Sequence, residues 1–170
     1  MELPRRARGD ELLAPGDMLR LRERMRVHGK KHDLATVIAY AFDHRTRVLP
    51  FVFYDFKVAP AGVRAIGSAL ADAGFEKTRI VLQQWNKRFS PQQMRIDGRV
   101  PDIFMVSSMH LHGSECDRLF QEACQYPPDQ RPLIIAGGSR VIYEPWCVFG
   151  ADEDNPWAAD VAVTGEEYAL

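Results

Sequence analysis

Small and polar residues follow four apolar runs of the sequence, and their chemistry suits a bound ligand. Glycine lets a ligand approach the backbone closely, and serine hydroxyls and free amides supply hydrogen bonds. If the apolar runs are parallel strands, their carboxyl ends share one edge of the sheet, where ligands bind in such folds. The four places are Tyr54-Asp55-Phe56-Lys57, Ser107-Ser108-Met109-His110-Leu111, Gly137-Gly138-Ser139-Arg140 and Thr164-Gly165-Glu166-Glu167.

The usual nucleotide-binding motifs are absent from the sequence. There is no GxxxxGK[ST], so a P-loop is excluded, and no GxGxxG follows a strand. A phosphate-accepting receiver domain would need clustered carboxylates and an acceptor Asp after the third strand, where Ser107-Ser108 stand instead. A flavin site would need a loop rich in Ser and Thr after the first strand, but the loop here reads DFKVAPAG.

Three further groups of residues have two interpretations each. His110 and His112 form an H-x-H pair that can bind a metal, yet no third ligand is near, so a polar loop is the other interpretation. Glu166-Glu167 are either acid–base groups or carboxylates that suit the start of a helix. Trp146 and Trp157 are interpreted as packing residues, with a tryptophan beside a flat bound ligand as the other interpretation. We therefore assign no catalytic residue and no metal ligand.

The elements that would position these residues alternate along the chain. Apolar strand-like runs occupy 34–42, 48–55, 78–85, 102–109, 132–138 and 159–167. A helix is predicted from Pro60 to Gly74, with Val63, Ile66 and Leu70 on one face. Ser90 and Ser114 are predicted N-caps of two further helices, the second burying Cys116, Leu119, Phe120 and Ala123, and a short helical piece is expected near 145–149.

Residues 34–55 favour a hairpin-like pair of strands. The runs LATVIAYAF (34–42) and VLPFVFYD (48–55) are joined by the polar turn DHRTR. The pair would place its first strand at an edge of the sheet.

Strands that are apolar on both faces and separated by helices indicate a parallel sheet covered on both sides. The predicted fold class is therefore α/β, a doubly wound, mostly parallel five-stranded sheet of the flavodoxin-like or Rossmann-like kind, with room for an extra edge strand. Residues 34–170 form this domain, and residues 1–33 form a basic arm that ends in an amphipathic helix with the stripe Met18, Leu21 and Met25.

Composition is that of a globular protein, with 46% hydrophobic and 26% charged residues and a net charge of −1. The three cysteines show no metal-ligand spacing and no disulfide framework, which favours a reducing cytoplasm. No apolar run is long enough to span a membrane. Nine basic residues precede residue 32, yet they lack interleaved aromatic residues, so we expect neither a nucleic-acid partner nor a membrane partner.

The run "PDIFMVSSM … RPLIIAGGSRVIYEP … ADVAVTGEE" resembles the N-terminal cobalamin-binding-type domain of radical S-adenosylmethionine (radical SAM) enzymes. In that family one strand ends in a small-residue loop, the next in GG before a segment ending in Glu-Pro, and the fifth in Gly-Glu. The resemblance covers roughly residues 36–170 and involves three motifs in the same order.

The resemblance implies a cofactor and a partner domain. Cobalamin would lie across the strand ends, with its nucleotide arm beside Ser107, Ser108, Gly137 and Gly138. The full set of implied contacts is Tyr54, Asp55, Phe56, Lys57, Ser107, Ser108, Met109, Leu111, Gly137, Gly138, Ser139, Gly165 and Glu166. A 4Fe-4S cluster and S-adenosylmethionine are expected only in a C-terminal catalytic domain, because the CxxxCxxC motif is not in this chain.

One departure from the family pattern leaves two hypotheses open. Cobalamin domains that ligate cobalt carry DxHxxG, whereas this chain has Lys57 for the histidine and Pro60 for the glycine. A protonated lysine has no lone pair and cannot ligate cobalt. Either the cofactor is held base-off without a protein ligand, or the domain is degenerate and positions a substrate or a protein partner instead. A stand-alone nucleotide- or flavin-binding protein is a third, more distant hypothesis.

Overall fold

A computed structural model of the 170-residue chain describes residues 16–42, 60–83, 88–149 and 158–165. Within them, five parallel strands form one sheet in the order β2-β1-β3-β4-β5. This order is the flavodoxin-like variant of the doubly wound fold, and it confirms the predicted fold class. The strands are β1 (Thr36–Tyr40), β2 (Thr78–Val81), β3 (Ile103–Ser107), β4 (Leu133–Gly137) and β5 (Val161–Ala162).

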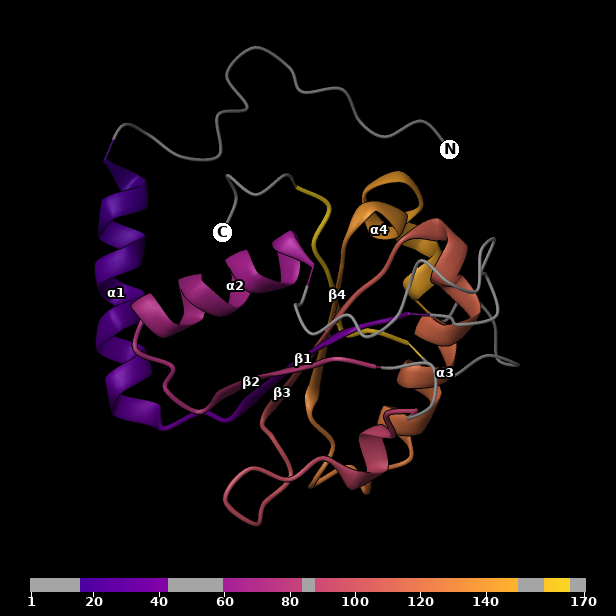
Figure 1. Cartoon of the computed structure of the whole chain (residues 1–170). Coiled ribbons are helices and arrows are strands. Elements are labelled where there is room, and N and C mark those ends of the chain that lie inside the picture. The colour runs from indigo at the N-terminus through magenta and orange to yellow at the C-terminus, as the bar shows by residue number, and fades with distance from the viewer. Residues whose placement is uncertain (1–15, 43–59, 84–87, 150–157, 166–170) are drawn as a thin grey trace.

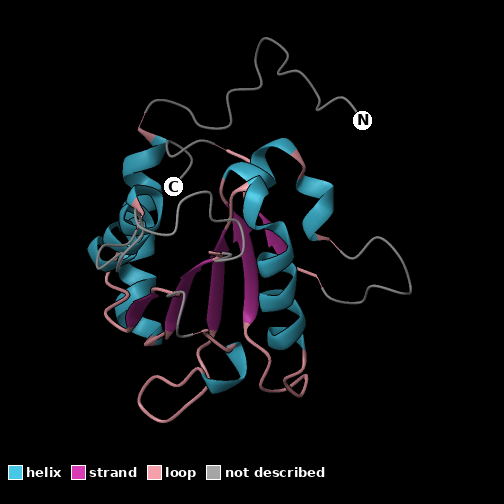
Figure 2. Cartoon of the chain, turned by 45° about the vertical axis from the view of Figure 1, so that its right-hand side comes forward, coloured by secondary structure: helices cyan, strands magenta, loops and turns pink. Residues whose placement is uncertain are grey.

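Helices lie on both sides of the sheet (Figures 1 and 2). In Figure 1, α1 (Asp17–His32) and α2 (Ala61–Asp72) lie to the left of the strands, and α3 (Gly113–Cys124) lies to the right. Shorter elements complete the described chain: α4 (Ser139–Tyr143) and the 3-10 turns η2 (Pro91–Gln93), η3 (His110–His112) and η4 (Pro145–Val148). None of the described helices is long and apolar enough to cross a membrane.

The two faces of the sheet are covered unequally. On the α3 face, alternate strand residues are at most 3% exposed and pack against Leu119, Phe120 and Ala123 of α3; they are Val37, Ala39, Phe104, Val106, Ile134 and Ala136. On the opposite face, α2 covers β1 and β2, and Ile38 is fully buried. Farther along that face, Leu133 is 43% and Val161 is 40% exposed.

The predicted hairpin is wrong in its placement of the first strand. β1 is central, because it pairs in parallel with β2 on one side and with β3 on the other. Its burial explains the position: residues 36–39 are all buried, which suits a strand covered on both faces. The second strand of the predicted pair, 48–55, lies outside the described residues.

Several helix details also differ from prediction. Ser90 holds the predicted N-cap position of η2, but its hydroxyl donates to Glu122 Oε2 at 2.6 Å and forms no capping hydrogen bond. Ser114 is the second residue of α3, and the N-cap position is held by His112. Two residues of the predicted stripe on α1 are not buried, since Leu21 is 41% and Met25 44% exposed, and the side chain of Met18 lies outside the described part. Arg22 and Arg26 hold α1 to α2 by pairing with Asp72.

Candidate functional site

The serine turn after β3 and the double glycine after β4 lie side by side at the carboxyl edge of the sheet. The Ser108 N–H donates to the Gly137 carbonyl at 3.1 Å, and the Arg140 N–H donates to the Ser108 carbonyl at 3.2 Å. The strand register pairs Ser107 with Gly137 and Ser107 with Tyr40 of β1. Three strand ends therefore meet at one place; the sequence predicts this for Ser107 and Gly137 but not for Tyr40.

Gly138 is bare because the chain itself occupies the space. A Cβ there would lie 2.6 Å from the Ser108 carbonyl oxygen and 2.8 Å from its nitrogen. The backbone also has φ 92° and ψ 177°, a conformation almost restricted to glycine. The contact between Gly138 and Ser108 thus closes the space in which the sequence analysis placed a ligand arm.

Gly137 is different, because a Cβ there would meet no described atom within 4 Å. Its φ is not positive, so the conformation does not require glycine. Because it lies two residues beyond Ile135, Gly137 faces the same side of the sheet as Ile135, Leu133, Ser107 and Tyr40. This is the incompletely covered face, so the open space above Gly137 adjoins a partly exposed apolar surface.

That apolar surface belongs to a row of residues that crosses the whole sheet. The register aligns Ile80, Ile38, Met105, Ile135 and Val161. Ile38 is buried beneath α2, while Met105 and Ile135 are half-buried. A flat apolar group could therefore lie over β3 and β4 and reach the edge at Gly137.

The crevice between β1 and β3, where the strand order reverses, is filled by aromatic side chains. His112 is 4% exposed, and its ring lies 5.8 Å from the Tyr40 ring and 5.2 Å from the Phe42 ring, measured between centroids. Burial raises the pKa of Tyr40, so its phenol stays protonated at neutral pH. A ligand at this edge is thus directed toward β3 and β4.

Segments beside the carboxyl edge of the sheet expose large apolar side chains. Met109 and Leu111, both predicted contacts, are 42% and 69% exposed. Trp146 is 46% exposed, so the interpretation of it as a packing residue is wrong. Tyr143 and Phe149 are exposed as well.

His110 Nδ1 lies 3.5 Å from Glu144 Oε2, which links the loop after β3 to the loop after β4.

The remaining predicted contacts are only partly described. Ser139 begins α4 and is half-buried, and Gly165 is exposed beyond β5. Tyr54, Asp55, Phe56, Lys57 and Glu166 lie outside the described residues. Among the described residues no group of three or more His, Cys, Asp or Glu side chains could hold a metal ion.

The buried thiol beneath the rim is not a nucleophile. Cys116 is fully buried, and burial raises its pKa to about 11, although the nearby Ser108 hydroxyl and Arg140 lower it. A thiol with this pKa stays protonated at neutral pH.

Arg140 itself donates to the Gly113 carbonyl at 2.8 Å and to Asp117 at 2.9 Å, so it fixes α4 to α3.

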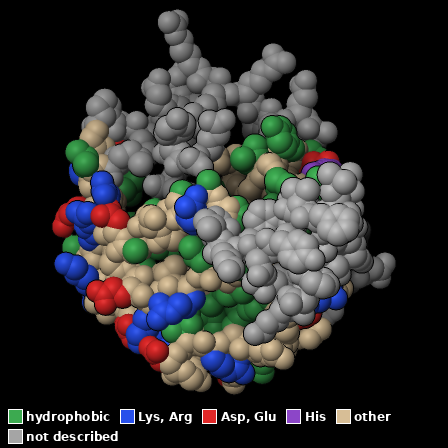
Figure 3. Space-filling view, in the orientation of Figure 1, with side chains coloured by type: hydrophobic (Ala, Val, Ile, Leu, Met, Phe, Trp, Pro, Cys, Tyr) green, Lys and Arg blue, Asp and Glu red, His purple; other side chains and the backbone are tan. Residues whose placement is uncertain are grey.

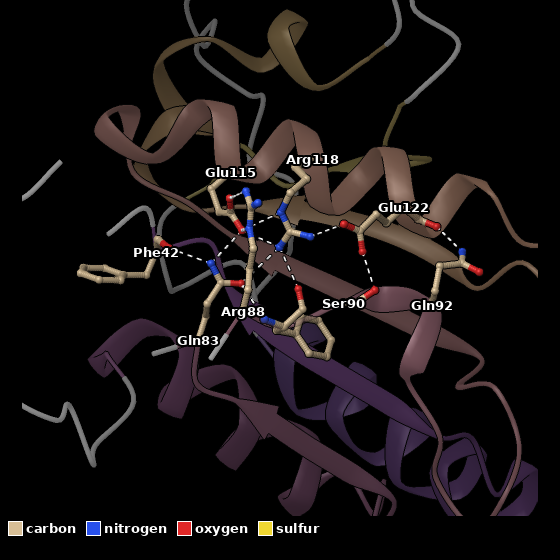
Figure 4. A network of polar contacts seen from close by, with 9 residues as sticks. Phe42, Gln83, Arg88, Ser90, Gln92, Glu115, Arg118 and Glu122 are labelled. Atoms are coloured by element: carbon tan, nitrogen blue, oxygen red, sulfur yellow. Dashed lines mark hydrogen bonds and ion pairs between the residues drawn. The ribbon is translucent and has the colours of Figure 1, made fainter. Parts of the chain in front are cut away.

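A polar network formed by Gln83, Arg88, Glu115, Arg118 and Glu122 supports the ends of β1 and β2 (Figure 4). Gln83 Nε2 donates to the Phe42 carbonyl at 2.9 Å and to Glu115 Oε1 at 2.7 Å. Arg88 donates to Glu115 Oε2 at 2.6 Å, and Arg118 donates to Glu115 Oε1. Arg118 also binds Glu122 and the Phe89 carbonyl. The network joins the chain after β2 to α3.

Glu115 is 1% exposed and remains charged because of this network. Burial by itself would raise its pKa, but hydrogen bonds from Arg88, Arg118 and Gln83 bring the pKa below its ordinary value of 4.5. The charged form is therefore the stable one in the folded protein.

The sequence does not single out Tyr40 or the polar network, and it suggests His112 only as a metal ligand or a polar loop residue, whereas the side chain is buried. Tyr40 was overlooked because the strand end was placed at Tyr54 rather than at the end of 34–42. The Glu115–Arg118 pair had a signal, since oppositely charged residues three apart precede the buried stripe Cys116, Leu119 and Phe120.

Comparisons with protein-family models, with curated proteins and with solved structures gave no significant match to this chain.

We expect the same substitution, glycine to alanine, to affect the free energy of unfolding much more at Gly138 than at Gly137. Gly138→Ala should lower the free energy of unfolding by roughly 2–4 kcal/mol, because the methyl group meets the Ser108 backbone in a conformation that alanine avoids. Gly137→Ala should change it by less than about 1 kcal/mol. Urea unfolding followed by circular dichroism measures both, and equal effects at the two positions would contradict the geometry.

Glu115→Gln should reveal the network through the pH dependence of stability. A lowered pKa in the folded state stabilises the protein above the unfolded-state value, and this contribution disappears as the pH falls through the folded-state pKa. We expect a loss of roughly 2–3 kcal/mol at pH 7, because charged hydrogen bonds to a buried carboxylate are removed. The difference between the two proteins should shrink below about pH 4.5.

Urea unfolding at several pH values tests this, with the exposed Glu76→Gln as the control that should show no such difference. A Glu115→Gln deficit that persists unchanged at pH 3 would mean that the carboxylate charge is not the source.

Proposed function

We propose that this chain is the accessory cobalamin-binding-type domain of a radical SAM enzyme, located in the cytoplasm. The observation that supports it best is the open space above Gly137, next to Ser107 and above the half-buried Met105 and Ile135. A large, flat, partly apolar group fits such a ledge. The sequence resemblance names cobalamin as that group.

The residues of this chain would act by binding and orienting the cofactor. Ser107 offers a hydroxyl, and the exposed Met109, Leu111 and Trp146 offer apolar contacts beside the rim. Cobalamin, when bound, supplies methyl-transfer or radical chemistry at its cobalt. The catalytic step itself would occur at the iron–sulfur cluster and S-adenosylmethionine of the chain's own C-terminal domain.

The proposal includes a cofactor held base-off without a histidine from this chain. His112 is buried against Tyr40 and Phe42, and His110 is paired with Glu144. Lys57, which stands where the family carries its cobalt ligand, cannot coordinate cobalt when protonated. We therefore expect a spectrum without the features of histidine ligation.

The alternative is a degenerate domain that binds no cofactor and positions a substrate or a protein partner. The filled crevice between β1 and β3 favours it, because the usual ligand position at the switch in strand order is taken by His112. The departures at Lys57 and Pro60 favour it too.

Hydroxocobalamin distinguishes the two hypotheses. The protein is mixed with it and desalted, and its visible spectrum is recorded. The proposed function predicts corrin bands retained at one per chain. Gly137→Val should weaken binding at least about tenfold without unfolding, because the larger side chain enters the open space but suits a strand.

Gly62→Ala is the control, since Gly62 also faces open space among the described residues but belongs to α2 and not to the ends of β3 and β4. It should bind like the original protein. A colourless protein after desalting would support the degenerate domain, and equal binding by Gly137→Val would place the cofactor elsewhere.

A further inference from the structure

A second surface with ligand-binding character lies on the outer edge of the sheet, away from the carboxyl rim. An open groove of about 420 Å³ runs along α2 and β2, where β2 is the edge strand among the described residues. We call it the α2–β2 groove; its lining residues are Arg64, Gly67, Ser68, Ala71, Phe75, Glu76, Thr78, Arg79 and Ile80. Figure 3 shows hydrophobic side chains exposed on this side of the molecule, with Lys and Arg side chains beside them.

The floor of the α2–β2 groove is apolar. Ile80 is 37% exposed although it lies on the α2 side of the sheet, in register with the buried Ile38. A Cβ at Gly67 would lie 2.9 Å from Ile80 Cδ1, so the glycine lets the isoleucine approach the helix. Ala71 and Phe75 extend the apolar lining. This floor favours a partner with aliphatic side chains.

The groove carries two arginines whose guanidinium groups form no ion pair with a carboxylate of the described chain, and they outnumber the one acidic residue of its lining, Glu76. Asp97 acts on Arg79 through its charge without pairing with it. Arg64 is exposed and its side chain has no hydrogen bond or ion pair within the described chain. The Arg79 guanidinium donates only to two backbone carbonyls, those of Thr78 at 2.9 Å and Glu76 at 3.4 Å. Charge complementarity therefore favours an acidic partner.

The backbone of β2 offers hydrogen bonds along the same edge. The Thr36 N–H donates to the Lys77 carbonyl, so in this parallel register Lys77 and Arg79 face β1. Thr78 and Ile80 consequently direct their N–H and C=O groups outward. Arg79 covers the Thr78 carbonyl, but this exposed hydrogen bond is weak and an incoming strand can replace it.

We propose that the α2–β2 groove binds an extended segment of a partner protein that carries aliphatic and acidic side chains, and that the segment adds to β2 as a strand. Backbone hydrogen bonds to Thr78 and Ile80 would give affinity, and the apolar floor would select aliphatic side chains on the α2 face. Arg79, which is in register with Val37 on the other face and donates to the Thr78 carbonyl, would select acidic side chains there, and Arg64 would add to the positive potential. This site is independent of the carboxyl rim, so it stands whether or not cobalamin binds.

The test uses a fluorescent eight-residue peptide of alternating valine and glutamate, with binding followed by anisotropy. We expect saturable binding that weakens with added salt. The double variant Arg64→Glu/Arg79→Glu should bind at least about tenfold more weakly. The matched control Arg24→Glu/Lys31→Glu, which makes the same charge change on exposed residues of α1, should stay within about twofold, because charges distant from the peptide are screened.

Two further peptides separate the contributions. A valine–lysine peptide should bind at least about tenfold more weakly because it repels both arginines. A valine–glutamate peptide with alternate backbone nitrogens methylated cannot form the strand ladder and should also lose binding. The proposal is overturned if the original protein shows no saturable binding, if charge reversal at Arg64 and Arg79 has no effect, or if the methylated peptide binds equally well.

Discussion

The carboxyl edge of this domain depends on one backbone contact, that between Gly138 and Ser108. It joins the ends of β3 and β4, because the chain after β4 can begin α4 only by passing against the serine turn. The contact also decides which of two adjacent glycines is structural. Gly138 lacks a side chain because the chain packs there, whereas a side chain at Gly137 would meet no atom of the described residues.

The second constraint is the uneven cover of the sheet. On one face α3 buries six strand residues almost completely, whereas on the other face α2 packs mainly on β1 and β2 within the described chain. The α3 face has no long helix between β2 and β3 in the described chain; a short 3-10 turn and the polar network around Glu115 and Arg118 hold that crossover in place. The same topology therefore gives a well-buried core beneath α3 on one face of the sheet and a partly exposed surface over β3 and β4 on the other.

Much of the fold was predictable, because apolar runs that alternate with helices leave few arrangements other than a parallel sheet. The runs 102–109 and 132–138 were placed correctly because both faces of those strands are apolar or partly buried. The run 34–42 was misplaced at an edge because the polar turn after it suggested a hairpin, although four successive buried residues are typical of a central strand.

The site was predictable only in part. Ser107 and Gly137 were identified from residue type, and their adjacency follows from the parallel register. That Gly138 packs on the Ser108 backbone, and that His112 fills the crevice beside Tyr40 and Phe42, depends on the exact path of two loops and on no pattern in the sequence. The same limit applies to the α2–β2 groove, since Arg64 and Ile80 are distant in sequence and meet only through packing of α2 on β2.

The central claim is that the open ledge at Gly137 receives the cofactor. Hydrogen–deuterium exchange with and without hydroxocobalamin tests it most directly, because exchange reports the site and not only binding. If cobalamin binds over Gly137, we expect slower exchange in peptides covering Ser107–Gly113 and Gly137–Tyr143, and unchanged exchange in α2 and β2. Protection confined to other segments, or no protection at saturating cofactor, would contradict it.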